Sequence, residues 1–239
     1  MATETEICNI ALGKLGGAGD VGGGNAFISS IDGSDKVSSW CKLVFPRVRR
    51  TVISDLATSK APFRSTVRFK DLGAVISEAN RPEIGNYTYA FNLPGDCLTV
   101  VSQFIEGSVV TRDQRAYSAP GGNVFNQWEV VANSSGTGKI LLTDYLTNED
   151  EDSAFIEYVI DTPATGGFSE ELINCIATML ASEVAPMVGR DMEASNTMMA
   201  KYEQVVLPKA KKANLAGFNN SARNVSNYRG GRSRSIGGL

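Results

Sequence analysis

The 239-residue sequence contains no histidine. Histidine is the side chain that titrates between pH 5 and 8 without perturbation, and it supplies the base of Ser-His-Asp and Cys-His catalysis and many zinc ligands. Those catalytic and metal-binding classes are therefore excluded. The sequence also has no run of 18 apolar residues, and its acidic, polar N-terminus differs from a basic and then apolar signal peptide. We therefore expect no membrane anchor and no secretion signal.

Cysteine is sparse as well. The four cysteines lie far apart in the sequence and form no C-x-x-C pair, which argues against a zinc site or a redox motif. Three of them lie on apolar faces of predicted helices, so we expect reduced, buried thiols and synthesis in the cytosol. The four residues are Cys8, Cys41, Cys97 and Cys175.

The net charge of −3 is unevenly distributed along the chain. No acidic residue follows Glu203, whereas seven lysines and arginines do, so residues 1–203 carry a net charge of −10. An acidic body thus precedes a basic tail. Tails of this kind usually bind nucleic acid or an acidic protein surface.

Hydrophobic periodicity predicts two helices at each end of the chain. Apolar residues recur every three or four positions in 5–15, where Thr3 or Thr5 is the expected N-cap, and again in 34–52. Pro46 lies inside the second pattern and predicts a kink or a break there.

The helical period returns after Ser169, which we expect to cap a helix that continues until Pro186, and again in a last helix that begins at Asp191. Between the two helical regions the pattern is that of short strands separated by turns. The predicted strands are 87–93, 98–105, 124–131, 138–145 and 154–160.

These elements predict an α+β fold. An isolated pair of amphipathic helices cannot bury its apolar stripe, so we expect the N- and C-terminal regions to form one antiparallel four-helix bundle. An antiparallel β barrel or sandwich is then inserted between the two halves. The predicted domains are a helical bundle, 1–58 plus 166–214, an inserted β domain, 59–165, and an extended basic C-terminal arm, 215–239.

Three motif-like stretches have simple structural interpretations. Residues 17–22 fit G-x-G-x-x-G, but a predicted helix precedes them where a dinucleotide site needs a strand. Residues 135–139 resemble the end of a P-loop, but Ile140 occupies the magnesium-binding Ser/Thr position, so we predict a hairpin turn. The acidic stretch 149–152 lacks the EF-hand pattern and is interpreted as a solvated loop. We therefore expect no enzyme activity and assign no catalytic residue, cofactor or metal site.

Several segments form a series in the sequence: EICNIALGKLG (6–16), ISSID (28–32), CKLVFPRVRR (41–50), YTYAFNLPGDCL (87–98), LASEVAP (180–186) and Tyr202. This series resembles the tail tubular protein A family, the head-to-tail adaptors of short-tailed bacteriophages, over most of the chain up to about residue 215. The chain departs from the family in the glycine-rich stretch 16–24, which looks like an insertion. It departs again at 59–64, where the family tends to have a tryptophan-containing segment.

The resemblance implies a structural protein of the virion, located at the head–tail interface. It implies a helical bundle with an inserted β module, assembled as a homo-oligomeric ring of twelve subunits. Such a ring docks under the portal protein and receives the tail nozzle protein and the tail fibres. Genomic DNA passes through its lumen without specific binding.

Under this interpretation the C-terminal arm is the portal-docking segment. It has neither a helical nor a strand period, and it places isolated apolar anchors among arginines, so it can become ordered only against a partner. Arginine pairs well with carboxylates on such a partner. The predicted docking residues are Phe218, Arg223, Val225, Tyr228, Arg229, Arg232, Arg234, Ile236 and Leu239.

Two alternatives stay open. The first is a glycan-degrading or glycan-binding tail component, which requires two carboxylates roughly 5–9.5 Å apart beside exposed aromatic residues. The second is a nucleic-acid-binding protein that uses the basic tail, whose affinity for DNA would fall steeply with salt.

Overall fold

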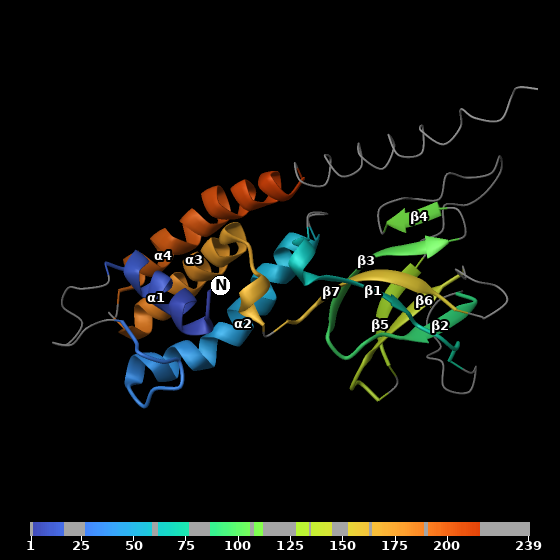
Figure 1. Cartoon of the computed structure of the whole chain (residues 1–239), viewed down its shortest axis with the longest axis horizontal. Coiled ribbons are helices and arrows are strands. Elements are labelled where there is room, and N and C mark those ends of the chain that lie inside the picture. Colours follow the sequence, from blue (N-terminus) through green and yellow to red (C-terminus); the bar gives the residue numbers. More distant parts are fainter. Residues whose placement is uncertain are drawn as a thin grey trace, which may run out of the picture. The chain divides into compact units, whose positions relative to one another are not determined.

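The structure, a computed structural model, has a mixed α+β fold (Figure 1). Two compact units make up the chain: Met1–Phe63 with Ala164–Leu239, called the helical unit below, and Arg64–Pro163, called the β unit. The described residues are 2–16, 27–58, 62–76, 87–105, 108–111, 128–133, 135–144, 153–162, 164–188 and 191–215.

The helical unit is organised around one central helix. Helix α3 (Glu170–Val188) packs against α1 (Glu4–Lys14), α2 (Lys36–Thr58) and α4 (Met192–Lys201). A short 3-10 helix, Thr165–Gly167, precedes α3. Helix α4 continues through a π-helical turn, Tyr202–Val206, into a last helical stretch that reaches residue 215.

The predicted helix starts are confirmed. Thr3 is the N-cap of α1, where its hydroxyl and the Glu6 side chain form a reciprocal capping box. The Ser169 hydroxyl accepts a hydrogen bond of 3.3 Å from the backbone N–H of Leu172 at the start of α3. The Asp191 carboxylate accepts a 2.8 Å bond from Ala194 at the start of α4. Each cap satisfies a backbone donor that the helix itself leaves unpaired.

A break at Pro46 and a helix end at Pro186 are not found, so these two predictions are wrong. Helix α2 is continuous through Pro46, and α3 continues past Pro186 to Val188. Pro46 lies on the exposed side of α2, where water can reach the carbonyl that lacks a donor. The opposite side buries Val44, Phe45 and Val48, and this burial outweighs the lost hydrogen bond.

The β unit contains two antiparallel sheets. The four-stranded sheet has the order β1 (Val67–Asp71), β7 (Phe155–Ile160), β3 (Cys97–Ile105), β4 (Ser108–Thr111). The three-stranded sheet has the order β2 (Tyr89–Asn92), β6 (Lys139–Thr143), β5 (Trp128–Ala132). The described strands do not close into a barrel, so that predicted alternative is wrong for this part of the chain. Strands β1 and β4 were not predicted, and both lie at sheet edges.

One hydrophobic core joins the two sheets. The Thr143 hydroxyl of β6 donates a 2.8 Å hydrogen bond to Gln103 Oε1 of β3, so a buried polar bond also links the sheets. Alternate residues of each strand point into this core, so the register of the strand pairs determines which side chains are buried. The cluster contains Phe91, Trp128 and Leu141 from the three-stranded sheet and Cys97, Val100, Ile156, Tyr158 and Ile160 from the four-stranded sheet.

Candidate functional site

The predicted docking arm lies outside the described residues. All nine predicted portal-docking residues fall within 216–239, which the structure does not describe. Leu215, the first residue of the predicted arm, belongs to the last helical stretch. The helix that leads into the arm, residues 192–215, is called the root of the arm below.

Specific polar contacts attach this helix to its neighbours. The Tyr202 hydroxyl donates a 2.9 Å hydrogen bond to Asp55 Oδ2 in α2. The Ser195 hydroxyl donates a 2.7 Å bond to the main-chain carbonyl of Ser182 in α3. Burial, together with the nearby Asp55 carboxylate, raises the pKa of Tyr202 far above its ordinary value. The root of the arm is thus anchored to both α2 and α3.

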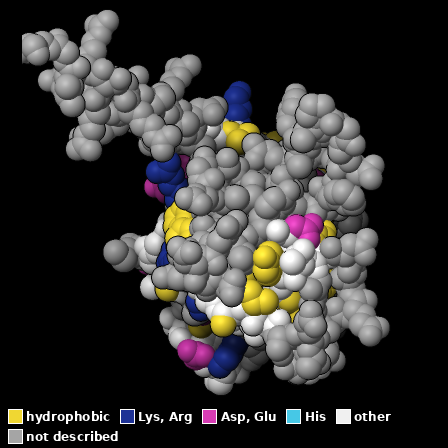
Figure 2. All heavy atoms as spheres, turned by 90° about the vertical axis from the view of Figure 1, so that its right-hand side faces the viewer, with side chains coloured by type: hydrophobic (Ala, Val, Ile, Leu, Met, Phe, Trp, Pro, Cys, Tyr) yellow, Lys and Arg dark blue, Asp and Glu magenta, His cyan; other side chains and the backbone are white. Residues whose placement is uncertain are grey.

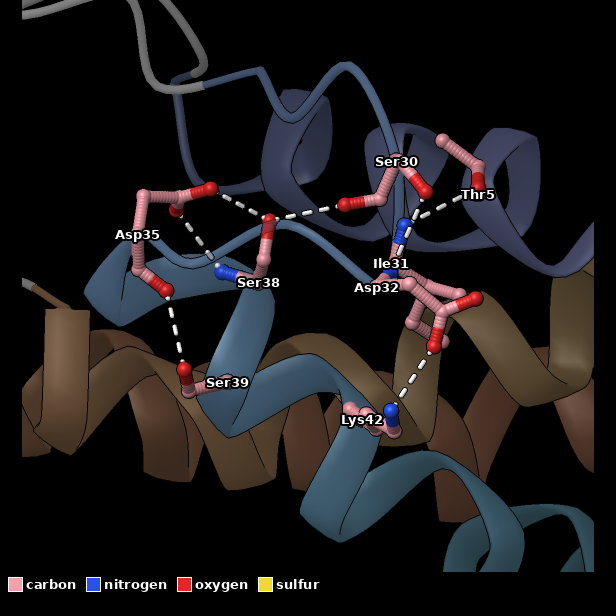
Figure 3. Close-up of polar contacts among 8 residues, drawn as sticks. All are labelled: Thr5, Ser30, Ile31, Asp32, Asp35, Ser38, Ser39 and Lys42. Carbon is pink, nitrogen blue, oxygen red and sulfur yellow. Dashed lines mark hydrogen bonds and ion pairs between the residues drawn. The ribbon is translucent and has the colours of Figure 1, made fainter.

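A polar network holds residues 27–35, the described stretch just before α2, which is called the connection below (Figure 3). The Asp35 carboxylate accepts a 2.9 Å hydrogen bond from the backbone N–H of Ser38 at the start of α2. The Ser38 hydroxyl lies within bonding distance of the Asp35 carboxylate and of the Ser30 carbonyl. These bonds from the side chain and backbone of Ser38 lower the pKa of Asp35. The backbone N–H of Ile31 donates to the Thr5 hydroxyl at 3.1 Å, which attaches the connection to α1.

The same connection is fixed at two further points. The Asn9 side-chain amide donates to the carbonyl of Ile28 and accepts from its N–H, both at 2.9 Å. Gly33 fits tightly, because a Cβ at this position would lie 2.8 Å from both Asp35 Oδ2 and Ser38 Oγ. The connection therefore has little room to adopt another conformation.

The outward face of α2 is cationic with an apolar centre. Leu43 is 67% exposed there, and Pro46 is exposed one turn further along the helix. Ion pairs orient two of the cations: Lys42 with Asp32 at 2.8 Å, and Arg47 with Glu183 of α3 at 2.6 Å. Arginines around an exposed apolar residue are common at protein interfaces. The exposed cations of this face are Lys36, Lys42, Arg47 and Arg50.

A depression of about 240 Å³ lies between the start of α3 and the last helical stretch. Beside it, Lys14 Nζ of α1 donates a 2.7 Å hydrogen bond to Asn174 Oδ1. Burial and the nearby Lys201 lower the pKa of Lys14. Acidic and basic side chains offset one another here, so the depression favours neither an anion nor a cation. Its lining residues are Glu170, Glu171, Asn174, Val206, Lys209 and Ala210.

The four cysteines are free and buried, as predicted. Burial raises the pKa of Cys97 to about 11 and that of Cys175 to about 12, so these thiols stay protonated and weakly nucleophilic at neutral pH. The thiols of Cys8 and Cys41 lie close to each other, and this neighbour together with burial raises the pKa of the Cys8 thiol. In the described part of the chain, no three His, Cys, Asp or Glu side chains gather into a metal-binding group.

The remaining sequence motifs have different outcomes. The predicted hairpin turn is confirmed: β5 and β6 pair up to Ala132 and Lys139, and Asn133 Oδ1 accepts bonds from the backbone N–H groups of Thr137 and Gly138. The glycine fingerprint at 17–22 and the acidic stretch at 149–152 lie outside the described residues.

Helix α3 has the length and apolar composition of a membrane span, and no other described helix does. Most of its length is buried against α1, α2 and α4 inside the helical unit. The core helix of a folded unit has the same length and composition, and burial of this kind is typical of such a helix.

Comparison with protein-family models and with curated proteins finds no match. The sequence pointed to the arm, which lies outside the described residues, and missed the outward face of α2, which the structure describes. One pattern could have located that face: Lys36, Leu43, Arg47 and Arg50 recur at helical spacing on the side opposite the apolar stripe.

Proposed function

We propose that this protein is the subunit of a head-to-tail adaptor ring in a bacteriophage virion. It links the portal to the tail nozzle and fibres, and the ring forms part of the DNA channel. The observation that carries this proposal is the position of the segments that resemble the tail tubular protein A family. The Asn9 side-chain amide forms two hydrogen bonds with the backbone of Ile28 in the second segment, and the free thiol of Cys8 lies beside that of Cys41 in the third.

The later segments are equally central to the helical unit. Leu180 is fully buried in α3, and Tyr202 bonds to α2 through Asp55. The segments 6–16, 28–32, 41–50 and 180–186 lie in the helical unit and contribute buried residues to it, whereas 87–98 lies in the β unit; the contacts within the helical unit support a shared architecture.

The proposal includes a more specific fold. The four helices form an antiparallel bundle, which is supported by the packing of α3 against the other three helices. The two sheets form a small sandwich inserted between the halves of the bundle, which is supported by their common core. The outward face of α2 and the anchored root of the arm are then available for contacts between subunits and with the portal.

The charge distribution suits this role. DNA must pass the channel without sticking, and a body with a net charge of −10 over residues 1–203 repels a polyanion where its carboxylates line the lumen. The arginine-rich arm fits carboxylates on a portal. One arm binds weakly because it must become ordered, but a ring of arms gains avidity from multivalency.

Negative-stain images of the purified protein mixed with portal rings test the proposal. We expect rings stacked on portals, and we expect a chain truncated after Leu215 to stay folded but lose this stacking. Heads that accept the truncated ring and retain their DNA would place the portal contact outside the arm. A lysine-lined bore in the assembled ring would contradict the channel argument. Salt-sensitive DNA binding without rings would favour the nucleic-acid alternative.

A further inference from the structure

The two most exposed large apolar side chains of the described residues lie on different helices of the helical unit. Leu43 of α2 is 67% exposed, and Met192 at the start of α4 is 61% exposed. Single exposed apolar residues are common, so their surroundings decide whether they mark a contact surface. On the described surface of the β unit that Figure 2 shows, hydrophobic side chains gather beside an acidic one, with no Lys or Arg between them. The surroundings of Leu43 and Met192 are more strongly charged.

Cations surround Leu43 on the outward face of α2. At about 100° per residue in an α-helix, four exposed residues of this face fall within about 60° around the helix axis. Arg47 pairs with Glu183, yet the Arg47 side chain stays 66% exposed, and Lys36 forms no ion pair with a described residue. This face is therefore positive and keeps N–H donors for a partner. The four residues are Lys36, Leu43, Arg47 and Arg50.

Met192 lies beside carboxylates on α4. None of the ten residues of α4 is buried, although the helix packs against α3. Glu193, and Glu203 in the π-helical turn, are exposed and form no ion pair with a described residue. The exposed residues between them have short side chains. The outward face of α4, which spans about 100° around the axis, consists of Met192, Glu193, Asn196, Ala200 and Glu203.

The charges on these two faces have nearly the same spacing. Lys36 and Arg47 are 11 positions apart on α2, which is about 16.5 Å at 1.5 Å per residue. Glu193 and Glu203 are 10 positions apart, which is about 15 Å. When the two helices lie side by side, each of the two cations can therefore reach a carboxylate. Leu43 then lies over the short side chains between the two glutamates.

The two faces belong to different sides of the helical unit. Helix α3 packs against both α2 and α4, and in Figure 1 α2 runs along the lower side of this unit and α4 along the upper side. One molecule cannot bring its own two faces together, because α3 separates them. A second copy can supply the missing face. Contacts between different patches of identical chains continue from copy to copy, and they close into a ring where the rotation allows.

We propose that the outward face of α2 binds the outward face of α4 on a second copy of this chain. DNA matches the outward face of α2 less well, because phosphates offer no apolar contact to Leu43 at its centre. A contact between two helix faces is smaller than the about 1,200–2,000 Å² of a stable interface, so we expect reversible association. Closure of these contacts into a ring rests on the proposed function, whereas the contact itself does not.

Sedimentation velocity of the full chain measures this association. The concentrations run from about 5 to about 500 micromolar, the range in which small interfaces dissociate. We expect the wild type to shift from monomers to oligomers as the concentration rises. The shift should be smaller in 1 M salt, where the screening length falls to about 3 Å and exposed charges attract each other less.

Charge reversal tests whether these two faces pair. Lys36→Glu with Arg47→Glu makes the outward face of α2 acidic, and Glu193→Lys with Glu203→Lys makes that of α4 basic. Each double variant alone should associate about tenfold or more weakly than the wild type, because like charges then meet. An equimolar mixture of the two variants should associate again, because each reversed face meets opposite charges on the other variant. A misfolded variant would not give this rescue.

Two matched controls accompany these variants. Lys70→Glu with Lys212→Glu changes the net charge by the same amount at exposed lysines outside both faces, and it should leave the association unchanged. Leu43→Ser should weaken the association, because the apolar centre of the contact is lost. Ile10→Ser removes another exposed apolar side chain, on α1 and outside both faces, and it should have no effect.

Three results would overturn the proposal. The first is a wild type that stays monomeric at every concentration. The second is a charge-reversed variant that associates as strongly as the wild type. The third is a mixture of the two variants that stays monomeric. Rings that still stack on portals after either reversal would remove this contact but not the adaptor role. Association that both reversals weaken and the mixture restores, without stacking on portals, would support the contact and remove the adaptor role.

Discussion

The helical unit and the β unit are assembled in different ways. Two distant stretches of chain build the helical unit, and the contiguous stretch Arg64–Pro163 builds the β unit. Burial in the helical unit is concentrated in one helix: 11 of the 19 residues of α3 are buried, and α1, α2 and α4 all pack against it. The β unit instead shares its core among the strands of two sheets. A single substitution should therefore damage the helical unit more severely.

The largest expected effect is that of Leu180→Asp. Leu180 is fully buried at the centre of α3, and an unpaired buried charge costs several kcal/mol against a typical domain stability of about 5–15 kcal/mol. We expect the helical unit to unfold while the β unit keeps its strands. Each unit contains one tryptophan, Trp40 in α2 and Trp128 in β5, so fluorescence of single-tryptophan variants separates the two transitions.

The conservative variant Leu180→Met is the control for this experiment, since volume-conserving swaps in a core usually cost less than about 1.5 kcal/mol. Unfolding of both units in one transition would show that the two units depend on each other. If the Trp40 fluorescence transition were unchanged in Leu180→Asp, α3 would not be the central helix of the helical core.

The elements that could be predicted from the sequence are those in which the capping residues and the pattern of buried apolar residues indicate the same structure. Thr3, Ser169 and Asp191 have side chains suited to N-caps, and each stands before an apolar run with a helical period. The main strands were predicted because their apolar residues face the shared core. The turn at Asn133 was recognised because Ile140 could not perform the role that a P-loop requires.

Features that depend on tertiary contacts were not predictable. The continuity of α2 through Pro46 depends on which side of the helix is buried, and periodicity alone does not weigh that burial against a lost bond. Strand β1 was missed because most of its residues are exposed and charged, as is usual for edge strands. The hydrogen bond from the Thr88 backbone N–H to Asp144 depends on the pairing of β2 with β6, which brings together residues 56 positions apart.

The second prediction concerns the tight connection in the helical unit. Gly33→Ala places a Cβ 2.8 Å from Asp35 Oδ2 and Ser38 Oγ and 3.1 Å from the Ser30 carbonyl. We expect a loss of about 1–3 kcal/mol, as for other overpacked sites. Gly95→Ala in the β unit is the matched control, because no atom lies within 4 Å of the added Cβ. Urea unfolding followed at each tryptophan measures both variants, and equal losses would contradict the argument.

The third prediction is specific to the root of the arm. Tyr202→Phe should cost about 1 kcal/mol at neutral pH, because the hydrogen bond to Asp55 is lost. The raised pKa of Tyr202 also makes stability depend on pH. Its contribution is complete below about pH 10, the ordinary pKa of tyrosine, and is lost at higher pH because the unfolded chain ionises first.

Denaturant unfolding at pH 7 and near pH 10.5 measures both effects. The wild-type helical unit should lose more stability on this change of pH than the Tyr202→Phe variant does. Tyr158→Phe, in the β unit, should leave the helical transition unchanged at either pH. A variant that is as alkali-sensitive as the wild type would show that other groups govern the alkaline transition.

The smallest expected effect is that of the ion pair between Arg47 and Glu183, although it joins α2 to α3 at 2.6 Å. The Arg47 side chain is 66% exposed, so water and salt screen the attraction, and a double-mutant cycle of Arg47→Ala with Glu183→Ala should give a coupling of about 0.2–1 kcal/mol. This coupling should shrink further in 1 M salt, where the screening length is about 3 Å. A larger coupling that persists in salt would mean that the helical unit depends on specific charge pairing as well as on the burial of α3. The helical unit and the β unit would then differ in their dependence on ion pairs as well as in how their buried residues are distributed among the elements.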